Sequence, residues 1–217
     1  VLFVFGLAGM LMGSLHAILE KDTRRMIAYS SVAQIGYIYM GIGLGTEAGM
    51  VAAVFHMFTH SATKALLFIS AVGLYEVSGN KKDYKSLRGA GYRNPLAGIG
   101  FSVGALSMVG FPMLAGFISK LLFATSALQS PNKMIITLIG LAVSTTLNAI
   151  YFLRLVITLY SREGDRDARG AAERSAVSKS SWKLRLAVLC FIFLNLILGL
   201  KSQPIVQAIA AGLSTLE

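Results

Sequence analysis

Three ionisable side chains lie four residues apart in the stretch FHMFTHSATKALLF, residues 55–68: His56, His60 and Lys64. On a helix they fall at about 0°, 40° and 80° and span roughly 12 Å of its length, so they form one narrow polar stripe. Imidazole and a desolvated lysine amine both exchange protons near neutral pH. Because ionisable groups inside a membrane usually serve transport, this pattern favours a proton relay over a packed histidine or a lysine that reaches the surface.

Lys120 is the second such residue, in GFPMLAGFISKLLF, residues 110–123. Gly110, Pro112 and Gly116 precede it, and proline interrupts a helix. We therefore expect a broken helix whose freed backbone groups lie near the lysine, as in many transporters. The alternative for Lys120 is an anchor at a helix end.

Several other charged residues border apolar segments and are possible auxiliaries of the same path. Interfacial charge explains the acidic and basic cluster of residues 20–25 equally well, and a core position explains His16 equally well. An arginine six residues from its helix end can also reach the surface. These auxiliaries are His16, Lys21, Asp22, Arg24, Arg25 and Arg154.

The composition is that of a membrane protein: 55% of the 217 residues are hydrophobic, 14% are charged, and the mean hydropathy is +0.66. The net charge of +10 comes from basic residues in short connections between apolar runs, which indicates membrane-flanking loops and no nucleic-acid partner. A single cysteine, Cys190, excludes a disulfide framework and a cysteine metal site.

Cofactor motifs are lacking in the sequence. The HxxxH spacing of His56 and His60 lacks the glutamate of a zinc protease, and two histidines on one helix face cannot both bind one haem iron axially. No nucleotide, flavin or iron–sulfur motif is present. We therefore expect no metal, no cofactor and no catalytic centre in this chain.

The elements that must position these residues are membrane helices, which need about 20 mainly apolar residues each. Seven segments qualify, so we predict an all-α, polytopic integral membrane bundle with one helix broken near Pro112–Lys120. Hydrophilic loops are expected at 79–94 and 161–183, and an amphipathic tail after Pro204, at 205–213, is expected in the interface. The segments are 2–19, 26–44, 48–77, two crossings within 95–129, 134–160 and 184–200.

If every segment crosses once, the basic loops 79–94 and 161–183 lie on opposite sides, which conflicts with the positive-inside rule. The chain also begins within an apolar segment, without an initiator methionine or a signal peptide. We therefore expect a piece of a longer protein or of a split one.

Three motifs, EKDTRRMIAYSSVAQIGY, FHMFTHSATKALLF and GFPMLAGFISK, occur in this order. Together they resemble the antiporter-like proton-translocating subunits of respiratory complex I, membrane-bound hydrogenases and multi-subunit Na⁺/H⁺ antiporters. The resemblance covers nearly the whole chain and implies helices eight to fourteen of about fourteen, in which two inverted five-helix repeats each supply a half-channel.

The resemblance also implies roles for individual residues. Lys120 corresponds to the lysine or glutamate on the broken helix, and His56, His60 and Lys64 lie on the family's central hydrophilic axis. Arg154 matches an arginine of the penultimate helix. Arg24 stands where the family often has lysine, and an arginine cannot deprotonate there.

From the resemblance we expect residues 1–160 to form the second half-channel with six helices, 161–183 a loop, and 184–217 the last helix and tail. The expected function is proton translocation as a subunit of a redox-driven pump in a prokaryotic inner membrane. Expected partners are the lipid bilayer, other membrane subunits, the absent N-terminal half-channel and redox subunits. A Na⁺/H⁺ antiporter subunit and a non-transporting membrane scaffold are the alternatives.

Overall fold

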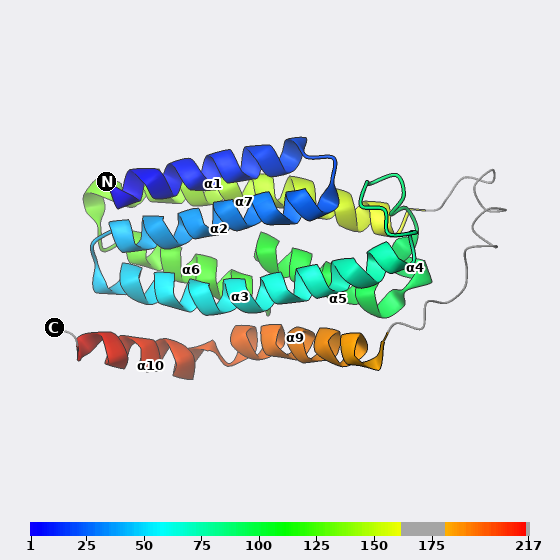
Figure 1. Cartoon of the computed structure of the whole chain (residues 1–217). Coiled ribbons are helices and arrows are strands. Elements are labelled where there is room, and N and C mark those ends of the chain that lie inside the picture. The colour runs from blue at the N-terminus through cyan, green and yellow to red at the C-terminus, as the bar shows by residue number, and fades with distance from the viewer. Residues whose placement is uncertain (162–180, 216–217) are drawn as a thin grey trace.

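The computed structural model describes residues 1–161 and 181–215, and every regular element there is a helix, apart from one isolated β-bridge between Asp22 and Asp83. The helices run roughly parallel or antiparallel in one elongated bundle (Figure 1). Each of the seven predicted apolar segments is helical. The elements are α1 (Leu2–Leu19), α2 (Thr23–Gly43), α3 (Glu47–Glu76), α4 (Ala90–Arg93), α5 (Pro95–Val109), α6 (Ala115–Ala127), α7 (Pro131–Leu159), α9 (Trp182–Leu200) and α10 (Ser202–Ser214).

Helices α1 and α2 pack very closely along most of their length, because glycines lie at their contact. A Cβ atom at Gly13 would come within 2.5 Å of the main-chain nitrogen of Ala33, and one at Gly36 within 2.5 Å of that of Met10. Asp22 begins α2 by accepting the main-chain N–H groups of Arg24 and Arg25, as an N-cap aspartate does.

Helix α3 has 30 residues and is the long central element of the bundle. Thr46 caps its N-terminus by accepting the N–H of Gly49. At about 1.5 Å per residue it is roughly 45 Å long, so both halves of the chain pack against it. Helices α1, α3, α7 and α9 are each long and apolar enough to cross a membrane on their own.

Helices α5 and α6 lie end to end and together form one passage antiparallel to α3, with the predicted break at residues 110–114 between them (Figure 1). Asn94, at the start of α5, donates to the carbonyl of Gly73 near the end of α3. In α6, the hydroxyl of Ser119 bonds His56 in the first half of α3. The region 95–129, which the sequence suggested could cross twice, therefore crosses once.

This single passage removes the conflict over the basic loops. The end of α7 comes back to loop 79–94, where the N–H of Gly89 donates to the carbonyl of Thr158 and the rings of Tyr92 and Tyr160 meet edge to face. Loop 79–94 and the described residue Ser161 thus lie at the same end of the bundle. Most of the predicted loop 161–183, residues 162–180, lies outside the described residues.

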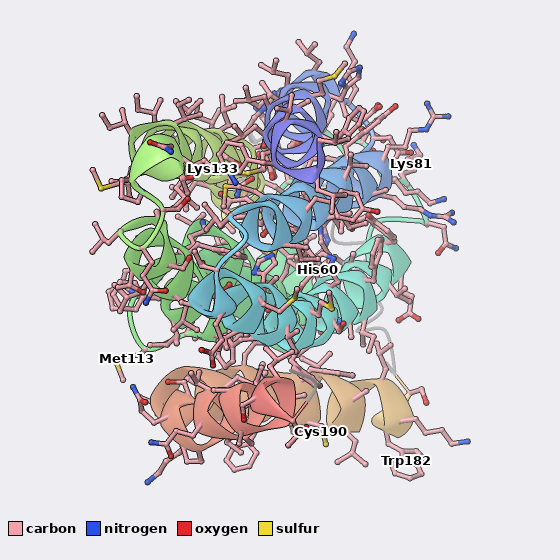
Figure 2. All side chains as sticks on the ribbon, turned by 90° about the vertical axis from the view of Figure 1, so that its left-hand side faces the viewer. His60, Lys81, Met113, Lys133, Trp182 and Cys190 are labelled. Atoms are coloured by element: carbon pink, nitrogen blue, oxygen red, sulfur yellow. The ribbon has the colours of Figure 1, made fainter. Side chains whose placement is uncertain are left out.

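Helices α9 and α10 run one after the other along the outer side of α3 (Figure 1). Figure 2 shows Trp182 and Cys190 on the face of α9 that points away from the bundle. The expected tail is α10, which begins at Ser202 and not after Pro204, and lies beside the first half of α3 and not across the end of the bundle.

Candidate functional site

Lys64 lies buried between α2 and α3, with 7% of its side chain exposed. Its amine donates to the main-chain carbonyl of Ile27 at 2.8 Å and to the hydroxyl of Ser30. The amine also lies 5.9 Å from the ring centroid of Phe152 on α7. Lys64 therefore does not reach the surface, and its polar contacts are neutral oxygens of α2.

The two histidines continue this stripe along α3, and Figure 2 shows His60 on the side of α3 that faces into the bundle. The rings of His60 and His56 are stacked with centroids 6.0 Å apart. Nδ1 of His56 bonds the hydroxyl of Ser119 at 2.5 Å, and its ring stacks on that of Tyr37. Nε2 of His56 and Nδ1 of His60 are buried without a hydrogen-bond partner among the described residues, so both nitrogens are available to water.

The last four carbonyls of a helix have no partner inside it, and α5 resolves this in two ways. Gly110 ends α5 with φ = 95°, a left-handed value that favours glycine. This turn lets the N–H groups of Gly110 and Phe111 bond the carbonyls of Leu106 and Ser107.

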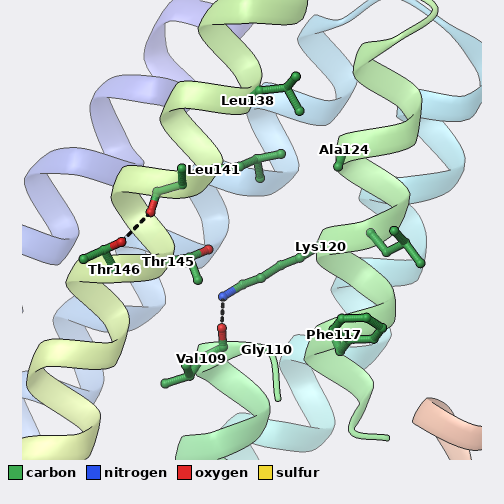
Figure 3. Close-up of a pocket in the computed structure, with 11 residues that line it drawn as sticks. Val109, Gly110, Phe117, Lys120, Ala124, Leu138, Leu141, Thr145 and Thr146 are labelled. Atoms are coloured by element: carbon green, nitrogen blue, oxygen red, sulfur yellow. Dashed lines mark hydrogen bonds between the residues drawn. The ribbon is translucent and has the colours of Figure 1, made fainter. Parts of the chain in front are cut away.

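Lys120 on α6 forms hydrogen bonds with the two remaining carbonyls of the last turn of α5. Its amine donates to Met108 at 2.8 Å and to Val109 at 2.7 Å, the second of which Figure 3 shows. The C-terminal end of a helix carries partial negative charge. The break in the passage therefore builds a site for a protonated amine from backbone atoms alone.

Lys120 also faces a cavity of about 510 Å³ between α5, α6 and α7 (Figure 3). Apolar side chains form most of its wall, and Thr145 and Thr146 of α7 add hydroxyl groups. The Lys120 amine lies 5.9 Å from the ring centroid of Tyr37, which stacks on His56. The Lys120 side chain therefore borders a mostly apolar cavity on one side and the aromatic ring of Tyr37 on the other.

The structure brings Lys64, His60, His56 and Lys120 together in that order. No Asp or Glu occurs within α1, α2, α5, α6, α7 or α9, and the two glutamates of α3 lie at its ends, Glu47 and Glu76. An unpaired charge at membrane depth is costly. The two lysines have no carboxylate on the described helices apart from those at the ends of α3, so they are suited to transient rather than permanent protonation.

The predicted auxiliaries lie elsewhere. Asp22 caps α2, and Glu20 accepts the N–H groups of Lys21 and Asp22 in the turn between α1 and α2. Arg24 and Arg25 are exposed beside them. This charged cluster is therefore at the end of the bundle, where it shapes a turn.

His16 and Arg154 are both exposed. His16 Nδ1 bonds the carbonyl of Met12, and its ring stacks on Tyr29. The guanidinium of Arg154 lies 4.5 Å from the ring centroid of Tyr84 in loop 79–94. Burial raises the pKa of the Tyr84 hydroxyl, and the nearby Arg154 opposes that shift. Neither residue contacts the stripe of α3.

Sequence reasoning did not find the residues of other helices that complete the site. Ser30 and Tyr37 of α2 and Ser119 of α6 each bond or stack on a predicted residue. Spacing along α3 carries no signal for them, although the seven-residue separation of Ser30 and Tyr37 places these two on one face of α2. Among the described residues, no group of three or more His, Cys, Asp or Glu is arranged to hold a metal ion.

Residues 1–147 match the family described as NADH:quinone oxidoreductase/Mrp antiporter, TM. NADH-quinone oxidoreductase subunit N of Geotalea uraniireducens (strain Rf4) is 31% identical over 211 residues, which are 96% of this chain and 42% of that protein.

Two solved structures have the same fold. A chain of the Mrp complex from Dietzia sp. DQ12-45-1b aligns with 97% of this chain and 46% of its own length, at 25% identity and a TM-score of 0.82. A chain of the membrane-bound sulfane sulfur reductase, an archaeal respiratory membrane complex, aligns with 97% and 41% at 26% identity and a TM-score of 0.82. This chain spans less than half the length of the curated relatives it matches.

Proposed function

Because this chain belongs to the NADH:quinone oxidoreductase/Mrp antiporter family of transmembrane subunits, we propose that it forms one half of a proton path in a redox-driven membrane complex. The path comprises Lys64, His60, His56 and Lys120, within the half-channel of residues 1–160. The observation that supports it is a line of four ionisable groups inside spanning helices whose only carboxylates, among the described residues, are Glu47 and Glu76 at the two ends of α3.

In this proposal protons move laterally from Lys64 past the two histidines to Lys120. Lys64 holds a proton on the oxygens of Ile27 and Ser30, and Lys120 holds one on the carbonyls that end α5. Lys120 then exchanges its proton with water in the cavity between α5, α6 and α7. The other half-channel and the redox centres belong to segments or subunits outside this chain, in a prokaryotic cytoplasmic membrane.

Replacing Lys120 by alanine in the complete protein, assembled in its complex, is expected to abolish proton pumping in vesicles. Lys133→Ala is the matched control, because Lys133 also bonds two carbonyls at a helix end, those of Gly43 and Leu44, but lies at the end of the bundle. We expect the complex with Lys133→Ala to pump protons in the same assay. A Lys120→Ala complex that pumps at the wild-type rate refutes the proposed path.

Na⁺/H⁺ antiport is the second candidate, supported by the likeness to a chain of the Mrp complex. Sodium-dependent proton flux in vesicles without an electron donor would favour it. Proton uptake that requires electron transfer and is independent of sodium favours the redox-driven pump.

A further inference from the structure

A second set of buried polar side chains lies between α1, α2 and α7, away from the stripe on α3. Its members are each at most 1% exposed: Ser14, Tyr37, Ser144, Asn148 and Tyr151. Four fully buried hydroxyls and an amide carry a large desolvation cost unless they are hydrogen-bonded. Tyr37 stacks its ring on His56, but the hydroxyl and amide groups of the cluster have no part in the path described above.

The cluster begins next to Lys64. The Lys64 amine donates to Ser30, and the hydroxyls of Ser30 and Ser14 both lie beside the hydroxyl of Tyr151. Tyr151 in turn donates to Oδ1 of Asn148, one turn earlier on α7. Polar atoms therefore lead from Lys64 across α2 and onto α7.

The cluster ends next to Lys120. Ser144 lies one turn before Asn148, and Ser144 and Thr145 both lie beside the hydroxyl of Tyr37. The Tyr37 hydroxyl is 3.5 Å from Oγ1 of Thr145, and Thr145 lines the cavity that holds Lys120. Polar side chains of α7, as well as the stripe on α3, therefore lie between the two lysines.

Three atoms in this row have no hydrogen-bond partner among the described residues: Oγ of Ser14, Oγ of Ser144 and Nδ2 of Asn148. The Ser14 hydroxyl lies next to the hydroxyl of Tyr151, and the Ser144 hydroxyl next to that of Tyr37. Buried polar atoms of this kind are normally satisfied by internal water, which needs two to four polar partners. Here each orphan atom has at least one polar neighbour on another helix or one turn away.

We propose that Ser14, Ser144 and Asn148 bind internal waters, which with Ser30, Tyr151 and Tyr37 form a second proton branch between Lys64 and Lys120 that bypasses both histidines. Each hydroxyl or water accepts a proton on one side and releases one on the other, so no group is changed after a transfer. The Asn148 amide positions water and carries no proton. This inference rests on the proposed proton path.

Tyr151→Phe tests the branch in the assembled complex, because it removes one hydroxyl and keeps the ring. Tyr75→Phe is the matched control: Tyr75 is 9% exposed and its hydroxyl bonds Thr23 at 2.9 Å, near the end of the bundle. We expect Tyr151→Phe to lower the pumping rate to the rate that the histidine path alone supports. We expect Tyr75→Phe to keep the wild-type rate when both complexes assemble equally well.

A second pair of variants separates conduction from folding. Asn148→Leu is expected to lower the pumping rate as Tyr151→Phe does, and Asn148→Ser, which still binds water, is expected to recover part of that loss. In a His56→Gln/His60→Gln protein, pumping should persist at a reduced rate and disappear when Tyr151→Phe is added. Wild-type pumping by both Tyr151→Phe and Asn148→Leu overturns the branch.

Two further results keep the branch distinct from the proposed function. If Lys120→Ala stops pumping while both branch variants pump normally, only the branch is wrong. If Lys120→Ala itself pumps, the proposed path fails. Independently of activity, a high-resolution density map of the complex should show waters within hydrogen-bond distance of Ser14, Ser144 and Asn148. A map that resolves ordered waters elsewhere but shows none at these three side chains overturns the proposal.

Discussion

The two buried lysines are held by neutral oxygens, and this choice of partner decides what they can do. A carboxylate partner would stabilise a permanent charge, whereas carbonyl and hydroxyl oxygens also accept a hydrogen bond from a neutral amine. Lys64 bonds Ile27 and Ser30, and Lys120 bonds Met108 and Val109. Both lysines can therefore lose a proton without losing their place.

Ser30→Ala tests the partner of Lys64. A hydrogen bond to a charged group contributes about 1.5–3 kcal/mol, so we expect its loss to lower the pumping rate several-fold. The neighbouring Ser31→Ala is the control, since Ser31 bonds only the carbonyl of Ile27. Equal pumping rates of the two variants in vesicles would show that Ser30 has no role in the path.

The sequence predicted the stripe of α3 because His56, His60 and Lys64 lie on one helix, where spacing alone fixes their relative positions. It also indicated Lys120, because glycine and proline mark the break beside it. Tyr37, Asn148 and Tyr151 come to the site from other helices, and helix packing is not encoded in local spacing. The charged residues 20–25 look equally reactive in sequence, yet Asp22 there caps α2.

At the scale of elements, the break between α5 and α6 depends on close packing as well as on the left-handed Gly110. A Cβ atom at Gly116 would overlap the carbonyl of Ser107, and the Gly116 N–H donates to the hydroxyl of Ser107 at 3.2 Å. That hydroxyl also donates to Asn195 of α9 at 3.0 Å. Helix α9 is therefore tied to the point where the passage is broken.

Gly116→Ala should separate α6 from α5. Overpacking at a tight contact costs about 1–3 kcal/mol, so we expect a lower melting temperature of the purified complex and reduced pumping. Gly212→Ala on α10 is the control, because a Cβ atom there meets nothing within 4 Å. A Gly116→Ala complex as stable as the control would contradict the packing described here.

Counting apolar residues could not tell that α5 and α6 share one passage. With 15 and 13 residues they are about 22 and 20 Å long, and their sum matches α3. The two helices are shown to lie end to end by two contacts with α3: Asn94 at the start of α5 contacts Gly73 near one end of α3, and α6 contacts His56 nearer the other end. The amphipathic tail was likewise predicted as an element, but its place beside α3 was not.

At the scale of the whole molecule, positive charge gathers at one end of the bundle. The α1–α2 turn and loop 79–94 both lie there, whereas loops 44–46 and 128–130 at the other end contain no lysine or arginine. By the positive-inside rule we expect the basic end to face the cytoplasm. The basic residues there are Lys21, Arg24, Arg25, Lys81, Lys82, Lys85, Arg88 and Arg93.

Cysteine labelling checks this orientation. In a Cys190→Ser background, we expect Lys85→Cys to react with a membrane-impermeant maleimide in inverted vesicles only. Gln129→Cys, exposed at the other end, should react in right-side-out vesicles only. The opposite labelling pattern would show that the basic end faces away from the cytoplasm and that the half-channel has the opposite direction.

Proton pumping by a Lys120→Arg complex tests the central claim most directly. A guanidinium keeps the positive charge and still donates to the carbonyls that end α5, but it does not deprotonate in proteins. If Lys120 carries protons, the Lys120→Arg complex assembles and transfers electrons to some extent, yet drives no proton uptake in vesicles. If it pumps at the wild-type rate, Lys120 is only a cap for α5 and the proton path described here is wrong.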